Sequence, residues 1–169
     1  MLKLFKHRKP GGNAIPAHMT TLSVSWLNRQ FHAVAVHRGV IEGRWEHPGE
    51  VELTGSFDAL LREAVQKTGY TGVNVSLLLT YPRLVQQVVD LPPLRGALLD
   101  KLIARQAQQQ KFFAGEAAWA YQPSVASKTS QRVILHLLPR TLLEQLGQSC
   151  RRSDLHLMSV LPASAVLQQ

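Results

Sequence analysis

The chain has 169 residues, which is enough for one ordinary domain or two small lobes but too few for a multi-domain enzyme. Its hydrophobic content of 45% and charged content of 18% are typical of a folded domain and exclude a disordered protein. A single cysteine, Cys150, excludes an intramolecular disulfide, and no stretch of the sequence predicts a membrane-spanning helix.

The formal net charge is +8, and the first nine residues, MLKLFKHRK, contribute four cations and no acid. Lysines alternate there with apolar side chains, a pattern that suits an anionic membrane surface. The residues expected at that surface are Lys3, Phe5, Lys6, Arg8 and Lys9. A solvated, disordered start is the alternative interpretation. The Pro and Gly residues between 10 and 19 predict a linker, and no apolar segment of signal-peptide length follows the basic residues.

Residues 21–47 alternate apolar and polar side chains and are rich in β-branched and aromatic types. Breaks at 27–29 and at Arg38-Gly39 predict three short antiparallel strands. An amphipathic helix is expected next, with Ser56 as its N-cap and Gly69 as its C-terminal stop. Its apolar residues recur at helical spacing: Phe57, Leu60, Leu61, Ala64 and Val65.

Residues 73–80 are dense in Val and Leu, which predicts a strand buried on both faces. A weaker strand is expected at 84–90, and a helix at 94–112. The buried stripe of that helix is expected to consist of Leu98, Leu99, Leu102 and Ile103.

Two further strands are expected at 116–122 and 131–138, joined by a hairpin loop. Thr141 and Glu144 have the spacing of a capping box, which predicts the start of another helix. The inner side of this helix is expected to carry Leu142, Leu143, Leu146 and Cys150. A last strand is predicted at 155–161.

Known catalytic and cofactor-binding motifs are missing from the sequence. It contains no Gly-rich phosphate-binding motif and no G-x-S-x-G, and its seven histidines include no pair at the i, i+4 spacing of a helical metal site. We therefore expect no catalytic residue and no metal site, and we interpret Cys150 as a buried structural thiol. Trp119 and Tyr121 share one strand face and either pack in a core or stack on bases. Scattered basic residues beyond the tail disfavour nucleic acid.

The order of segments resembles that of the PilM family of type IV pilus, competence and type II secretion systems. The resemblance rests on the basic start MLKLFKHRK, the hairpin LSVSWLNRQFHAVAV, the segment VNVSLLLTYPRLVQQVVDLPPL, the helix LIARQAQQQKFF and the closing SVLPASAVL. It implies an α/β fold, namely the first lobe of an actin-like, ribonuclease H-like protein with an inserted strand-helix-strand-strand subdomain. The implied division is a tail and linker at 1–20, a main subdomain at 21–83 and 151–169, and the inserted subdomain at 84–150.

The family's first phosphate loop reads D-I-G-S-S-S-V-K, whereas the matching stretch here has no acid and no glycine. The counterpart residues are Ser23, Ser25, Trp26, Asn28 and Arg29. Bulky side chains obstruct the close backbone approach that phosphate needs, so we expect no cofactor and no enzymatic activity. In this respect the chain is similar to degenerate relatives of the family, the secretion-system L protein and the HofM and MshI types.

The resemblance therefore implies a non-catalytic scaffold on the cytoplasmic side of the inner membrane. The implied partner is the N-terminal peptide of a PilN-like membrane protein, held in an apolar groove between the main sheet and the inserted subdomain. We predict that Tyr81, Pro82 and Arg83 contact it. Whether the protein forms a homo-oligomer stays open. Two alternatives remain: an ATP-binding actin-like protein whose second lobe is not in this chain, and a ferredoxin-like nucleic-acid-binding module built from 84–161.

Overall fold

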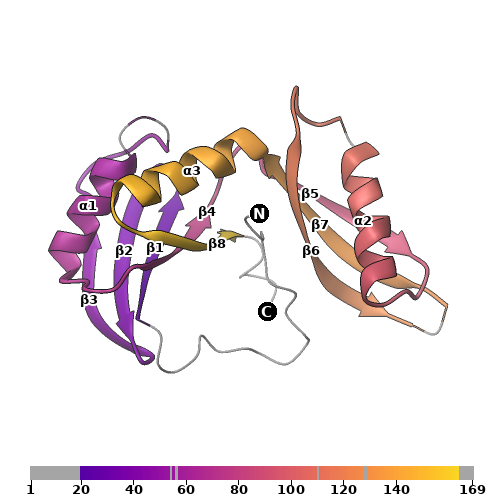
Figure 1. Cartoon of the computed structure of the whole chain (residues 1–169), viewed down its shortest axis with the longest axis horizontal. Helices are drawn as coiled ribbons and strands as arrows, with labels where there is room; N and C mark the ends of the chain where they lie inside the picture. The colour runs from indigo at the N-terminus through magenta and orange to yellow at the C-terminus, as the bar shows by residue number, and fades with distance from the viewer. Residues whose placement is uncertain (1–19, 54, 56, 110, 128, 164–169) are drawn as a thin grey trace. The chain divides into compact units, whose positions relative to one another are not determined.

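The computed structural model describes residues 20–53, 55, 57–109, 111–127 and 129–163. The expected membrane contacts of the tail and the expected N-cap Ser56 lie outside these residues. The elements are β1 (Thr21–Leu27), β2 (Gln30–His37), β3 (Val40–Glu46), α1 (Phe57–Thr68), β4 (Asn74–Leu79), β5 (Val85–Leu91), α2 (Ala97–Gln109), β6 (Ala117–Ala126), β7 (Gln131–Pro139), α3 (Arg140–Arg152) and β8 (His156–Pro162) (Figure 1). The described chain forms two compact units: a smaller unit of residues 82–143, and a larger unit of residues 20–81 and 144–163.

The larger unit is built on a five-stranded sheet of order β3-β2-β1-β4-β8. β1, β2 and β3 pair antiparallel as predicted, whereas β4 runs parallel to both β1 and β8. The two predicted breaks are two-residue turns with left-handed backbone at Asn28, Arg29, Arg38 and Gly39. Such turns match the twist of a β-hairpin. The register of β1 with β2 is regular, whereas that of β2 with β3 shifts between Ala35 and Val36.

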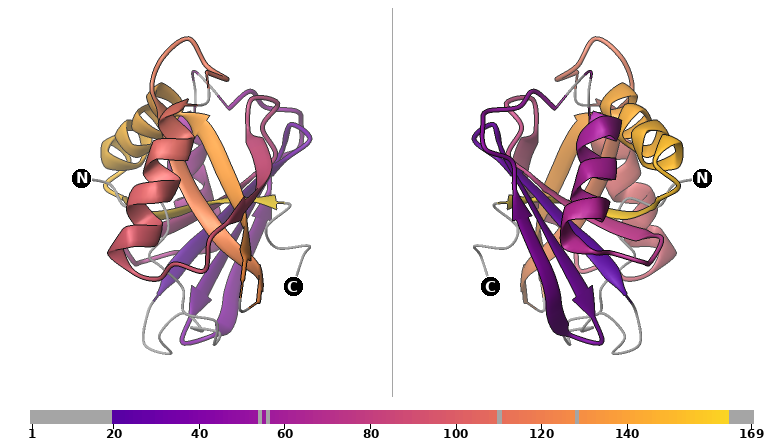
Figure 2. Two further views of the ribbon diagram at one scale, coloured as in Figure 1. Left: turned by 90° about the vertical axis from the view of Figure 1, so that its right-hand side faces the viewer. Right: turned by 90° about the vertical axis from the view of Figure 1, so that its left-hand side faces the viewer.

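α1 and α3 lie on the same face of this sheet (Figure 2). Phe31 of β2 is fully buried on that face and meets Phe57 of α1 and Trp45 of β3 edge-on, at ring-centre distances of 5.9 Å and 5.7 Å. The predicted inner side of α3 is confirmed, because Leu142, Leu143, Leu146 and Cys150 are all buried. The apolar face expected of α1 is likewise buried, except that Val65 is only half-buried.

Burial on both faces was expected for β4, and this expectation is wrong. Val75, Leu77 and Leu79 are buried under the helices, while the alternate residues Asn74, Ser76 and Leu78 are only half-buried. The reason is that both helices of this unit cover the same face of the sheet. The predicted end of α1 is confirmed at Gly69, whose φ of 66° lies in the left-handed region that favours glycine.

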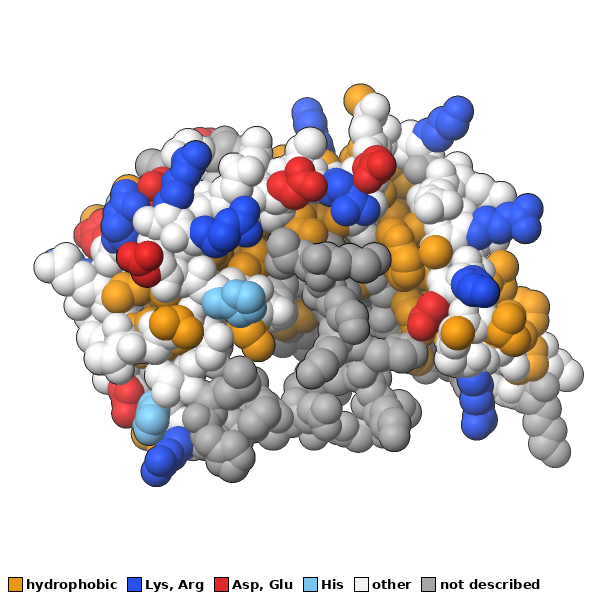
Figure 3. Space-filling view, in the orientation of Figure 1, with side chains coloured by type: hydrophobic (Ala, Val, Ile, Leu, Met, Phe, Trp, Pro, Cys, Tyr) orange, Lys and Arg blue, Asp and Glu red, His pale blue; other side chains and the backbone are white. Residues whose placement is uncertain are grey.

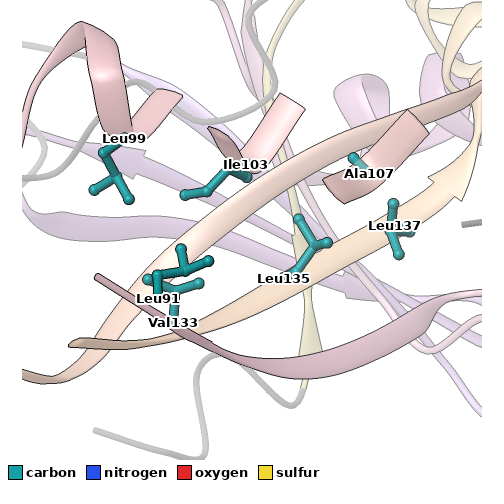
Figure 4. Packing of buried hydrophobic residues seen from close by; sticks show 7 residues of the cluster. All are labelled: Leu91, Leu99, Ile103, Ala107, Val133, Leu135 and Leu137. Carbon is teal, nitrogen blue, oxygen red and sulfur yellow. The ribbon is translucent and has the colours of Figure 1, made fainter. Parts of the chain in front are cut away.

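The smaller unit has a three-stranded antiparallel sheet of order β5-β7-β6, and α2 covers one of its faces. Figure 4 shows the core between them, in which side chains of α2 point toward those of β5 and β7. The cluster consists of Leu91, Leu99, Ile103, Ala107, Val133, Leu135 and Leu137.

Three sequence-based expectations about this region are corrected. α2 spans Ala97–Gln109 instead of 94–112, because Gly96 before it has a left-handed φ of 58°. Leu98 does not belong to the buried stripe, since 63% of it is exposed. α3 begins at Arg140, directly after β7, so Thr141 lies inside the first turn instead of capping it. The backbone N–H of Arg140 donates to the carbonyl of Glu116, and the two side chains form an ion pair of 2.7 Å.

The structure also decides between the two interpretations of Trp119 and Tyr121. Both rings pack against the core beneath α2, and the Tyr121 hydroxyl donates a 2.9 Å hydrogen bond to Asp100. Burial and this carboxylate raise the pKa of Tyr121 well above its usual range. The pair is therefore part of the core, as the packing interpretation predicted.

The ferredoxin-like alternative is wrong. A free-standing module would need the last strand to pair with strands of the 84–161 segment, but β8 pairs with β4 in the sheet that contains the first hairpin. The chain is an α/β protein in which the strand-helix-strand-strand segment from β5 to β7 forms a sheet of its own.

Candidate functional site

The carboxyl ends of the parallel strands β1 and β4 bring two of the predicted site segments together. The backbone N–H of Thr80 donates to the carbonyl of Trp26 at 3.0 Å, and the Thr80 hydroxyl accepts from the N–H of Asn28 at 3.0 Å. Thr80 thereby joins the phosphate-loop counterpart to the connector of residues 81–83, which follows it directly. Sequence reasoning missed Thr80, because Asn28 and Thr80 are 52 positions apart.

The turn between β1 and β2 is covered by the segment of residues 50–52. Val51 donates its N–H to the carbonyl of Arg29 at 2.8 Å and accepts from the indole of Trp26 at 2.9 Å. The guanidinium of Arg29 pairs with Glu50 at 3.0 Å and with Glu52 at 2.8 Å. All three charged side chains are more than half exposed, so each pair stabilises the turn by less than about 1 kcal/mol.

The five residues of the phosphate-loop counterpart do not converge on one point. Trp26 is buried in the core face of β1, where only 5% of it is exposed. Ser23 and Ser25 are half-buried on the opposite face, in register with Ser76 and Leu78 of β4. Asn28 and Arg29 form the turn itself.

This geometry differs from that of a phosphate-binding loop. Such a loop presents backbone N–H groups to the ligand, whereas the N–H of Asn28 already donates to Thr80. The carboxylates of Glu50 and Glu52 oppose the charge of Arg29 and would repel a phosphate brought to the turn. The polar groups of this turn are therefore engaged in contacts within the protein, which suits a structural role instead of phosphate binding.

The connector of residues 81–83 is a short turn between β4 and β5. Tyr81 is half-buried, and Pro82 and Arg83 are exposed, so all three side chains retain surface that a partner could contact. The division between the two units falls inside this connector, between Tyr81 and Pro82.

A metal site and a reactive thiol are the other kinds of chemistry that the described ranges could hold. No group of three or more His, Cys, Asp or Glu side chains lies close enough there to hold a metal ion. Cys150 is fully buried, and burial raises the pKa of its thiol to about 12, which keeps it protonated and chemically inert at neutral pH. No helix in the part of the chain that the structure covers is long and apolar enough to cross a bilayer.

The five-stranded sheet of order β3-β2-β1-β4-β8, with its antiparallel start and parallel end, and the separate β5-β7-β6 sheet define a mixed α/β fold. Among solved structures it is similar to the PilM-PilN type IV pilus biogenesis complex, with a TM-score of 0.74 and 11% identity over 86% of this chain and 48% of that chain. It is also similar to the cytoplasmic domain of EpsL, an inner membrane component of the type II secretion system of Vibrio cholerae. That match has a TM-score of 0.55 and 14% identity over 85% of this chain and 57% of that one.

These similarities confirm the expected fold class and the structural resemblance to PilM. The chain spans about half the length of the structures it matches. No protein-family model matches the sequence, and no curated protein does.

Proposed function

We propose that this chain is a non-catalytic scaffold of a type IV pilus or type II secretion assembly platform at the cytoplasmic face of the inner membrane. The observation that carries the proposal is the match to PilM in its complex with PilN, which extends over 86% of the chain. The similarity to the cytoplasmic domain of EpsL, a component of the inner membrane, supports the location.

The non-catalytic part of the proposal rests on the turn between β1 and β2. Its amide at Asn28 is engaged by Thr80, and its cation at Arg29 is paired with two carboxylates. A nucleotide would have to displace these contacts before it could bind. Calorimetry with ATP and magnesium on the full chain and on any longer parent protein tests this. Micromolar affinity for ATP would contradict the proposal of a scaffold that binds no nucleotide and would favour the ATP-binding alternative.

The partner we propose is the cytoplasmic N-terminal peptide of a PilN-like membrane protein, contacted by Tyr81, Pro82 and Arg83. Pro82 and Arg83 are exposed and Tyr81 is half-buried, and they directly follow Thr80, whose hydrogen bonds hold the end of β4 to Trp26 and Asn28.

Titration of a fluorescent peptide of this kind against the full chain tests the proposal. Truncation of Tyr81 or Arg83 to alanine should weaken binding about tenfold, as expected for a central contact residue. Lys67→Ala, an exposed cation on α1, is the matched control and should leave the affinity unchanged. No saturable binding by the unmodified chain, or equal binding of a scrambled peptide, would contradict the proposal.

A further inference from the structure

The positive charge of the folded chain is concentrated in the smaller unit. Residues 82–143 contain eight Lys and Arg against three Asp and Glu, whereas the described part of the larger unit contains seven against eight. This difference is not apparent from the sequence alone, because Lys and Arg residues occur along its whole length. The separation into two units makes the smaller one strongly basic and the larger one nearly neutral.

The three acids of the smaller unit all make contacts within it. Asp90 pairs with Arg132 at 2.8 Å, Glu116 pairs with Arg140 at 2.7 Å, and Asp100 accepts the hydroxyl of Tyr121. By count, five cations are therefore in excess, and most of them lie on α2 or beside its ends.

The outward face of α2 combines these cations with exposed apolar side chains. Leu98, Lys101 and Arg105 are exposed and recur at i, i+3 and i+7, on the side opposite the buried Ile103. Phe112, just beyond the helix, is 48% exposed. We use the name α2 stripe for Leu98, Lys101 and Arg105 on this face together with the exposed residues beside the ends of the helix, Arg95, Lys111 and Phe112. Figure 3 shows Lys and Arg side chains with hydrophobic ones beside them over the surface of this unit.

We propose that the α2 stripe binds the surface of an anionic lipid bilayer. Its cations would face the headgroups, and Leu98 and Phe112, near opposite ends of the stripe, would enter the boundary with the acyl chains. The stripe is the convex side of a single helix with apolar side chains only near its ends. An acidic protein would instead require a continuous apolar centre depleted of lysine, which this surface does not offer. Because a lipid bilayer is a different ligand from the PilN-like peptide, this inference does not depend on the proposed peptide contact.

Co-sedimentation of the full chain with vesicles tests the proposal. Phosphatidylcholine vesicles with added phosphatidylglycerol should bind the chain, phosphatidylcholine alone should not, and added salt should release it. The double variant Lys101→Gln, Arg105→Gln should lower the partition coefficient about 25-fold, because each cation near the surface contributes about fivefold. Arg44→Gln with Lys67→Gln removes the same charge from exposed positions of the larger unit and should change binding less than about twofold.

A second pair of variants tests the apolar contribution. Leu98→Ser should weaken vesicle binding, whereas Val73→Ser, at a position 57% exposed in the larger unit, should not. The N-terminal tail is unchanged in every variant, so the comparison isolates α2. Circular dichroism checks that each variant remains folded.

The proposal would be overturned if the unmodified chain did not bind anionic vesicles, or if both double variants bound alike. Binding to polyglutamate or single-stranded DNA without vesicle binding would also overturn it and would assign the stripe to an acidic protein or to nucleic acid. Because peptide titration is a separate measurement, loss of vesicle binding with retained peptide binding affects only this inference.

Discussion

Gly43 shows how tightly single positions are constrained where β3 passes the C-terminal end of α1. A Cβ atom there would lie 2.8 Å from the carbonyl carbon of Thr68 and closer still to its oxygen. The end of α1 cannot easily move away, because the Thr68 hydroxyl donates to the carbonyl of Ala64 and the N–H of Tyr70 to that of Val65. The obstacle is therefore backbone rather than a flexible side chain.

Gly43→Ala is expected to lower the free energy of unfolding by about 1–3 kcal/mol, since the added methyl forces the strand and the helix apart. Gly115→Ala is the matched control, because nothing lies within 4 Å of a Cβ at that position, and its effect should stay within about 0.5 kcal/mol. Urea unfolding followed by circular dichroism measures both. Equal stability of the two variants would contradict the packing described for Gly43.

Tyr70 is a second residue whose role depends on distant contacts. Its hydroxyl donates to the carbonyls of Thr20 and Asn74 and accepts from the N–H of Asn74. Burial raises the pKa of this phenol, so it stays neutral and able to donate across the ordinary pH range. One side chain thus fixes the chain next to the start of β1 and the start of β4.

At the scale of elements, α2 has one face that is buried in the core of the smaller unit and another that is exposed. Leu99, Ile103 and Ala107 are buried against the small sheet, whereas Leu98, Lys101 and Arg105 face outward. The leucine-rich run at 98–103 does not reveal by itself which leucine faces the sheet. The start of the helix after Gly96 and the position of β7 decide it.

Two truncations that each remove a branched aliphatic side chain test this assignment. Ile103→Ala should destabilise the smaller unit by about 2–5 kcal/mol, because Ile103 is fully buried and its truncation leaves a cavity in the core. Leu98→Ala should change stability by less than about 0.5 kcal/mol. Thermal or urea unfolding of both variants gives the comparison. A loss at Leu98 comparable to that at Ile103 would mean that Leu98 belongs to the buried stripe, as expected from the sequence.

At the scale of the whole molecule, the two sheets differ in which strands lie inside them. β1, β2 and β4 are flanked on both sides in the larger sheet, and β7 is the central strand of the smaller one. β3 and β8 in the larger sheet, and β5 and β6 in the smaller one, have only one neighbouring strand in the described chain. Paired strands in the middle of a sheet open only with the whole unit, whereas edges can open locally.

Amide hydrogen exchange should therefore be slowest in β1, β4 and β7 and faster by at least about tenfold in β3 and β5, since each factor of ten needs only about 1.4 kcal/mol of local opening free energy. Mass spectrometry of exchanged peptides measures this order. Because all strands are measured in the same experiment, each strand is an internal control for the neighbouring strands. Uniform exchange across the five-stranded sheet would contradict the strand order.

The sequence by itself determined the elements whose signals are local. Period-two alternation and two-residue turns at Asn28-Arg29 and Arg38-Gly39 specify the first three strands, and helical spacing with Gly69 specifies α1. The resemblance in segment order also predicted the fold class that the PilM match confirms. These features were predictable because each depends on residues a few positions apart.

Only the tertiary structure decided the features that join distant segments. It brought Thr80 to Asn28, placed Glu50 and Glu52 around Arg29, and turned Leu98 outward. It also separated residues 82–143 as a unit of their own, and the excess of cations in that segment becomes apparent once the unit is defined. The physical reason is that the elements follow from local periodicity, whereas burial and long-range hydrogen bonds follow from which elements pack on which face.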